Sequence, residues 1–180
     1  DTEPIKVVTG IRRCGKSSLL KLMAAHLREN GVNDEQIIEM NFESYEFIKM
    51  TSDDLYQYVK ERSLPGKRMY LFFDELQRMA GWENTINAFR VDLDCDIYIT
   101  GSNAKLLSGE LATYLGGRYV EFVIYPFSFG EFMELYRSIA PDAPIQQCFQ
   151  KYLLAGGMPY LANLRYADAP SKQYLHDLFN

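Results

Sequence analysis

The sequence predicts an α/β domain built on a parallel β-sheet. Short runs rich in β-branched and aromatic residues alternate with segments whose apolar residues recur at helical spacing. The run Met69–Phe73 is almost wholly apolar, which is typical of a strand buried on both faces of a parallel sheet. Such an alternation indicates βαβ crossovers, and these place helices over both faces of the sheet.

The expected elements follow from local signals along the chain. Strands are predicted where short β-rich runs end at glycine or polar residues, at 5–9, 37–42, 69–73, 96–100 and 119–125. Helices are predicted where apolar residues recur at 3.6-residue spacing or after capping residues, at 16–29, 53–62, 82–91, 104–115, 128–136 and 145–155. Asn30-Gly31 ends the first helix, and Pro65-Gly66 is a turn.

Two regions are expected. The alternating pattern covers residues 1–126 and predicts the α/β core, whereas residues 127–180 show helical spacing without a further strand. We interpret this second region as a helical lid that is cut short at its end. The sequence opens only a few residues before the first strand, so we expect the chain to be part of a longer protein.

Composition limits the function classes. The chain has 180 residues, of which 47% are hydrophobic and 24% charged, with a net charge of −5. No Lys/Arg cluster supports a nucleic-acid interface in this segment, and no apolar stretch approaches the roughly 20 residues of a membrane span. Three scattered cysteines without metal-ligand spacing are typical of reduced thiols, so we expect a cytoplasmic protein without a zinc site.

The segment Gly10–Ser17 carries the strongest functional signal. It matches the phosphate-binding loop G-x-x-x-x-G-K-[ST], or Walker A motif, directly after a strand and directly before a helix. Gly10 and Gly15 allow a tight backbone turn whose N–H groups surround phosphate oxygens. The helix that begins near Lys16 points its free N–H groups at the same anion. The alternative is a chance glycine turn before an ordinary helix.

Each residue of this loop has an expected role toward ATP. Lys16 should reach the β- and γ-phosphates, and Ser17 should supply a hydroxyl to Mg²⁺. Ser18 adds a contact to the α-phosphate. Arg12 and Arg13 either line the mouth of the site or face solvent. The remaining residues of the expected nucleotide-binding set are Gly10, Cys14 and Gly15.

The strand that ends in Phe73-Asp74-Glu75 narrows the chemistry. An apolar strand in a parallel sheet delivers Asp74 to the ligand edge, where its carboxylate would hold Mg²⁺ as in a Walker B motif. Glu75, one residue further, is placed to orient and deprotonate an attacking water. The alternative is a surface acidic pair that caps the following helix.

Two further positions are candidates for contacts with the γ-phosphate. The strand at 96–100 is followed by small polar residues, and Ser102 or Asn103 could act as a sensor of the phosphate or cap the next helix. Arg118 follows a Gly-Gly pair and could neutralise charge on the phosphate in its own site or in a neighbour's. Both sets of alternatives stay open.

The ordered motifs resemble a known family. They are similar to those of prokaryotic AAA-type P-loop ATPases that usually pair with a C-terminal DUF4143 domain. The motifs are Thr9–Ser17, Asp74–Gln77, Thr100–Asn103, Gly117-Arg118, Pro126–Phe132 and Tyr152–Pro159.

The resemblance implies a five-stranded parallel sheet in the order 5-1-4-3-2, a helical lid, and ATP with Mg²⁺ as ligands. It implies Walker B roles for Asp74 and Glu75, a sensor role for Ser102 or Asn103, and an arginine-finger or sensor role for Arg118. Family members are longer, so a C-terminal effector domain would lie outside this chain. A homo-oligomer is implied where Arg118 acts across an interface.

Hydrolysis of ATP is the predicted activity, with two rivals. A small-molecule kinase shares the P-loop, but Glu75 argues against it because a kinase excludes water. A nucleotide-dependent switch would need only the P-loop and would bind tightly without turnover. A GTPase is disfavoured because no N-K-x-D motif for reading guanine occurs.

Overall fold

The computed structural model describes residues 4–101 and 115–179 and divides them into two compact units. The first unit spans residues 1–10 and 16–123, and the second spans 11–15 and 124–180. The first unit contains the α/β elements β1 (Ile5–Gly10), α1 (Lys16–Glu29), β2 (Ile37–Asn41), α2 (Ser52–Arg62), β3 (Met69–Asp74), α3 (Trp82–Asp92), β4 (Cys95–Thr100) and β5 (Tyr119–Ile124). The expected helix at 104–115 lies almost entirely outside the described residues.

The five strands form one sheet in the order β2-β3-β4-β1-β5. β1 pairs with β4, β4 with β3 and β3 with β2, all in parallel. The predicted parallel sheet and its order are therefore confirmed. In this order β3 and β4 are internal strands, which explains why their sequences are almost wholly apolar.

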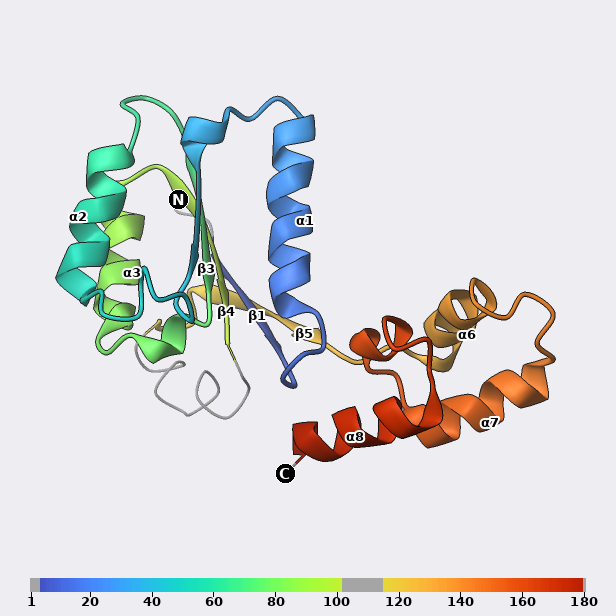
Figure 1. The fold of residues 1–180 in the computed structure, drawn as a ribbon. Coiled ribbons are helices and arrows are strands. Elements are labelled where there is room, and N and C mark those ends of the chain that lie inside the picture. The colour runs from blue at the N-terminus through green and yellow to red at the C-terminus, as the bar shows by residue number, and fades with distance from the viewer. Residues whose placement is uncertain (1–3, 102–114, 180) are drawn as a thin grey trace. The chain divides into compact units, whose positions relative to one another are not determined.

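Helices cover both faces of the sheet in the first unit, α1 on one and α2 with α3 on the other (Figure 1). The face under α2 and α3 carries the larger apolar core. Its fully buried members include Val7, Leu71, Phe73, Ile99, Leu55, Val59, Ile86 and Phe89. On the other face, Phe72 stacks on Tyr98 with ring centroids 4.7 Å apart. Because the core holds the strands in register, their ends are fixed relative to one another.

Local capping explains where two of the predicted helices begin. Thr51 accepts a hydrogen bond from the backbone N–H of Asp54, whose carboxylate accepts one from the N–H of Thr51. The Thr51 hydroxyl also donates to this carboxylate at 2.6 Å, and this bond, followed by the one from the Thr51 N–H, lowers the pKa of Asp54. Ser128 and Glu131 form the same reciprocal pair at the start of α6 (Phe129–Arg137), where the hydroxyl and N–H of Ser128 donate to Glu131 and lower its pKa. Such a capping box satisfies backbone N–H groups that the helix cannot pair itself.

The described part of the second unit after β5 is helical. It contains α6 (Phe129–Arg137), α7 (Ile145–Ala155) and a further helix α8 (Asp168–Phe179) that the apolar spacing does not predict. Pro170 lies in the first turn of α8, where proline removes no helical hydrogen bond. The helices enclose an aromatic cluster in which Phe132 contacts the rings of Tyr136, Tyr152 and Tyr166.

One glycine of the second unit is required by close packing. Phe127 donates its backbone N–H to the carbonyl oxygen of Gly157 at 2.8 Å. A Cβ atom at Gly157 would come within 2.0 Å of the carbonyl oxygen of Phe127, so a larger residue cannot occupy this position without moving the backbone.

Candidate nucleotide site

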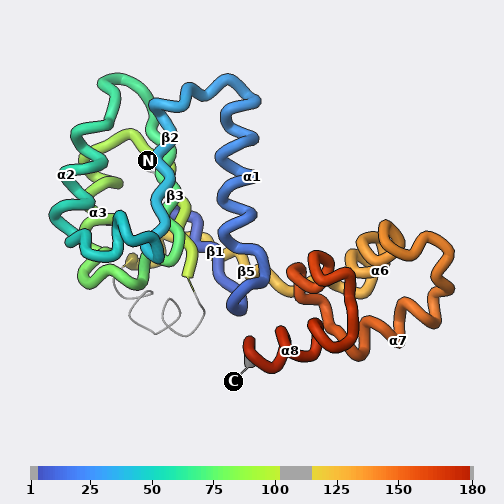
Figure 2. The backbone as a smooth tube through the Cα atoms, in the orientation of Figure 1, coloured from blue at the N-terminus to red at the C-terminus, as the bar shows by residue number. Residues whose placement is uncertain are grey.

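The loop between β1 and α1 has the backbone geometry that a phosphate-binding loop needs. Gly10 has φ 149° and Gly15 has φ 111°, conformations that residues with a Cβ rarely adopt. Arg13 is also left-handed, with φ 63°. Figure 2 follows the chain from β1 through this loop into α1. The glycines expected from the motif thus lie where the chain turns.

Lys16 and Ser17 open the first turn of α1. The Lys16 side chain is buried, and its Nζ donates to the carbonyl oxygen of Gly10 at 3.1 Å. Ser17 is half-buried and Ser18 is exposed. The N–H groups in the first turn of a helix point out of its amino end, where they can donate to an anion. The side chains of Arg12 and Arg13 are exposed, whereas Cys14 is buried as a free thiol.

Asp74 lies at the carboxyl end of β3 between two neighbouring strand ends. Its Oδ1 accepts a hydrogen bond from the Oγ1 of Thr100 on β4 at 2.5 Å. Its Oδ2 accepts from the Nδ2 of Asn41 on β2 at 3.2 Å. The β2–β3 register places Asn41 directly opposite Asp74. Both bonded side chains are neutral, so they orient the carboxylate without cancelling its charge.

Glu75 occupies a sharp turn directly after β3. Its backbone is left-handed, with φ 56° and ψ 38°, which is uncommon for a residue other than glycine. Its backbone N–H donates to the Oγ1 of Thr100 at 3.0 Å. Its carboxylate accepts a hydrogen bond from the Nε2 of Gln77 at 2.5 Å. Such strain is held in place by surrounding contacts and occurs often at functional sites.

A cavity of about 130 Å³ lies at this edge of the sheet in the first unit. Ser17 and Asp74 both line it, so the two residues expected to hold Mg²⁺ face one space. Other lining residues are Leu20, Lys21, Glu39, Met40, Asn41 and Phe72.

The available oxygen atoms fit Mg²⁺. Within the described residues no group of three or more His, Cys, Asp or Glu side chains could hold a metal on its own. Mg²⁺ suits such a site, because it is commonly bound by one or two protein oxygens while substrate phosphates and water complete its octahedron.

Arg118 lies away from this edge. Its carbonyl oxygen accepts a hydrogen bond from the backbone N–H of Ile5, the first residue of β1. Gly10 lies at the other end of that strand, about 17 Å away at 3.3 Å per residue. An arginine side chain does not span that distance, so the position of Arg118 does not favour a role in the site of its own chain. Ser102 and Asn103 lie outside the described residues.

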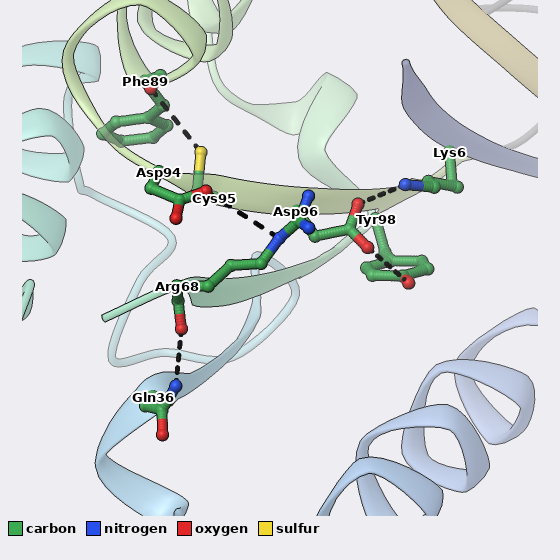
Figure 3. A network of polar contacts seen from close by, with 8 residues as sticks. All are labelled: Lys6, Gln36, Arg68, Phe89, Asp94, Cys95, Asp96 and Tyr98. Atoms are coloured by element: carbon green, nitrogen blue, oxygen red, sulfur yellow. Dashed lines mark hydrogen bonds and ion pairs between the residues drawn. The ribbon is translucent and has the colours of Figure 1, made fainter. Parts of the chain in front are cut away.

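A second polar group lies in the amino half of the same sheet. Lys6 on β1 forms an ion pair with Asp96 on β4, and the hydroxyl of Tyr98 donates to the same carboxylate at 2.8 Å (Figure 3). Asp96 is buried and Lys6 nearly so. The adjacent Cys95 is a partly buried thiol whose pKa is raised to about 12, chiefly by burial and then by Asp94 and Asp96. In the ion pair of this group, the positive charge of Lys6 balances the negative charge of Asp96.

Three contributors to the site are not identified by the sequence reasoning: Asn41, Gln77 and Thr100. Asn41 and Thr100 end apolar strands, and this position is the signal that could have identified them. Gln77 belongs to the Asp-Glu-Leu-Gln motif, but only the turn at Glu75 brings its amide to the carboxylate.

Comparisons with known proteins agree with the fold. The model of a family described as AAA domain matches residues 2–133. An uncharacterized protein of Haemophilus influenzae is 41% identical over 175 residues, covering 96% of this chain and 43% of that protein. An uncharacterized protein of Methanocaldococcus jannaschii is 30% identical over 186 residues, covering 97% of this chain and 41% of that protein. The chain thus spans about two fifths of the length of these relatives.

Solved structures share the architecture at low sequence identity. Caenorhabditis elegans PCH-2 gives a TM-score of 0.65 at 15% identity, covering 95% of this chain and 61% of that one. A Thermotoga maritima RuvB mutant, P216G, gives 0.61 at 16% identity, covering 97% and 57%. At such identities the likeness concerns the fold alone. Among the described residues no helix is both long and apolar enough to cross a bilayer.

Proposed function

Because this chain belongs to the AAA domain family, a family of ATPase-type nucleotide-binding domains, we propose that it binds ATP with Mg²⁺ and hydrolyses it to ADP and phosphate. The observation that carries the proposal is the meeting of three strand ends. Asn41 and Thr100 each donate a hydrogen bond to the carboxylate of Asp74, which lines the same cavity as Ser17. This arrangement supplies an oriented carboxylate at the ligand edge of a parallel sheet.

The proposed binding step uses the loop and the start of α1. The N–H groups of the first turn of α1 and of the glycine loop would donate to the phosphates. Lys16 would exchange its bond to the Gly10 carbonyl for contacts with the β- and γ-phosphates. Ser17 and Asp74 would hold Mg²⁺, which when bound neutralises charge on the phosphate oxygens.

The proposed hydrolytic step uses Glu75. Its carboxylate would accept a proton from a water molecule, whose oxygen forms a bond to the γ-phosphorus. The bond between that phosphorus and the β–γ bridging oxygen breaks, and its electron pair leaves with ADP. The left-handed turn at Glu75 and its bond from Gln77 support this role, because they fix the carboxylate one residue beyond Asp74.

Turnover and binding should be measured together on the wild-type chain and on Glu75→Gln. The variant should keep ATP affinity within about threefold, because the amide has the same shape as the carboxylate. It should lose turnover by about 100-fold or more, because it cannot accept the proton. Equal turnover in both proteins would refute the assignment of Glu75. Tight binding without turnover in the wild type would favour a nucleotide-dependent switch.

We also propose that Arg118 acts toward the site of a neighbouring copy in a homo-oligomer. The carbonyl oxygen of Arg118 is bonded to Ile5 at the amino end of β1. This supports the proposal, because the carboxyl ends of the strands in the same chain lie too far away for the Arg118 side chain to reach. Turnover per chain should then rise with protein concentration in the wild type, and Arg118→Ala should remove the rise. A concentration-independent rate would contradict the proposal.

A further inference from the structure

Thr100 joins the two acidic residues of the site. We propose that Thr100 is a positioning residue that sets the orientation of Asp74 toward Mg²⁺ and the backbone of Glu75 toward water. The inference deepens the proposed function and rests on it. It concerns a residue that contacts neither phosphate nor water in the proposed mechanism and acts through the two residues that do.

The geometry of the hydroxyl carries the proposal. A threonine hydroxyl has one proton to donate and lone pairs to accept with. Thr100 donates to Oδ1 of Asp74 at 2.5 Å and accepts from the backbone N–H of Glu75 at 3.0 Å. One oxygen atom thus binds a side chain and the following peptide group, which couples the two orientations.

Burial makes this coupling rigid. Thr100 has 0% of its surface exposed, so water cannot take over its bonds when the hydroxyl is removed. Leaving the N–H of Glu75 and one oxygen of Asp74 without this partner would cost more than a surface hydrogen bond, because buried polar groups lose their hydration. The hydroxyl is therefore a contact from β4 that orients the residues at the end of β3.

The second oxygen of Asp74 is held independently. Asn41 donates to Oδ2 at 3.2 Å from β2, on the opposite side of β3. With a partner on each oxygen, the plane of the carboxylate is defined from both neighbouring strands. Loss of the Thr100 bond should let the carboxylate rotate about its remaining contact. Groups that orient metal ligands in this way typically change metal affinity or activity by 10–100-fold when removed.

The left-handed turn at Glu75 adds a second reason. This conformation is unfavourable for a residue with a Cβ, so the surrounding contacts must favour it. The bond from the N–H of Glu75 to Thr100 is such a contact at the residue itself. Without it the turn can relax, and the carboxylate of Glu75 would lose its defined direction.

Four variants separate positioning from general stability. Thr100→Val removes the hydroxyl but keeps the branched shape, and Thr100→Ser keeps the hydroxyl. Thr85→Val is the matched control, because Thr85 is a buried threonine whose hydroxyl bonds the carbonyl of Ser52 between α3 and α2. Thr100→Ala is the fourth variant. ATP dissociation constants are measured by calorimetry in Mg²⁺ and in EDTA, with kcat alongside.

The proposal predicts a defined pattern. Thr100→Val should bind ATP in EDTA like the wild type, but Mg²⁺ should tighten its binding about tenfold less, and kcat should fall by about 10–100-fold. Thr100→Ser should keep both quantities within about threefold. Thr85→Val should match the wild type in both. If circular dichroism shows Thr100→Val to be unfolded, Thr100→Ala against Thr100→Ser gives the same comparison.

Two results for the variants would overturn the proposal. One is a folded Thr100→Val with wild-type Mg²⁺ dependence and kcat, and the other is an equal loss in Thr85→Val. The proposed hydrolysis fails in a different way, through a wild type that binds ATP with Mg²⁺ but does not turn over. In that case the Mg²⁺ dependence of binding still decides whether Thr100 orients Asp74. A wild type whose ATP binding ignores Mg²⁺ would overturn both proposals.

Discussion

Polar side chains cluster at both ends of the strands in the first unit, but the two clusters differ in how their charges are balanced. In the amino half, Lys6 and Asp96 pair with each other, and the hydroxyl of Tyr98 donates to the same carboxylate. At the carboxyl edge, Asp74 is bonded by a neutral hydroxyl and a neutral amide. The first group balances its own charge, whereas the second directs a negative charge into a cavity.

This difference separates stability from function within one sheet. A balanced, buried ion pair has no charge left for a ligand, and removing one partner leaves the other buried and uncompensated. A carboxylate held by neutral donors keeps its charge for a cation. We therefore expect substitutions in the amino half to change the free energy of unfolding and those at the carboxyl edge to change ligand binding and turnover.

The largest expected effect concerns two lysines, Lys6 on β1 and Lys16 at the start of α1. Lys16→Ala should weaken ATP binding by about 100-fold, because it removes charge-assisted hydrogen bonds to the phosphates. Lys6→Ala should leave ATP affinity within about threefold while it destabilises the fold. Calorimetric titration of both variants checks this. Unchanged affinity in Lys16→Ala would mean that the site is elsewhere.

The next effect tests the amino half alone. Asp96→Asn should lower the free energy of unfolding by about 2 kcal/mol, because it removes the negative charge that Asp96 places against Lys6. Urea unfolding measures this difference, and ATP affinity should not change. A folded variant with tenfold weaker ATP binding would show that the amino half contributes to the site.

A smaller effect is expected from the contact between Gln77 and Glu75. Gln77→Ala removes one hydrogen bond to the carboxylate and should lower kcat by about fivefold, which corresponds to roughly 1 kcal/mol. The dissociation constant for ATP should stay the same, because Gln77 makes no contact with the phosphates or Mg²⁺ in the proposed mechanism. Arg78→Ala, at the exposed neighbouring position, serves as the control. A rise in kcat would instead indicate that Gln77 restrains Glu75.

The smallest effect lies outside both polar groups. Thr51→Ala removes the capping side chain of α2 and should lower the unfolding midpoint by a few degrees at pH 7, with ATP binding unchanged. Thr51 lowers the pKa of Asp54, so this stabilisation is present above the ordinary Asp pKa of about 3.9. It is lost as the pH falls through the lower folded value. Melting curves of both proteins should therefore converge in acid, and a constant difference would contradict this linkage.

Much of the fold was predictable because its signals are local. Strand bounds follow from short apolar runs such as Met69–Phe73, and the helix at Lys16–Glu29 follows from 3.6-residue spacing and a terminating Asn-Gly pair. The phosphate loop is contiguous in sequence, so its glycines and Lys16 can be recognised without tertiary information. Helix α8 is not predicted because large apolar side chains with helical spacing occur only in its second half, at Tyr174, Leu175 and Leu178.

The remaining parts of the site depend on strand pairing. Asn41 meets Asp74 only because β2 pairs with β3 in one particular register. Thr100 meets Asp74 and Glu75 only because β4 lies next to β3. The carbonyl bond of Arg118 to Ile5 is likewise set by how the sheet is assembled. Register is a property of the folded sheet, so a single sequence read along its length does not reveal these contacts.

The measurement that tests the central claim most directly is a calorimetric titration of ATP in Mg²⁺ into the wild-type chain and into Asp74→Asn. The account predicts saturable binding at one site in the wild type. In the variant, Mg²⁺ should no longer tighten binding, because the charge directed into the cavity is gone. No saturable binding by the wild type, or identical Mg²⁺ dependence in both proteins, would contradict the assignment of the carboxyl edge as the nucleotide site.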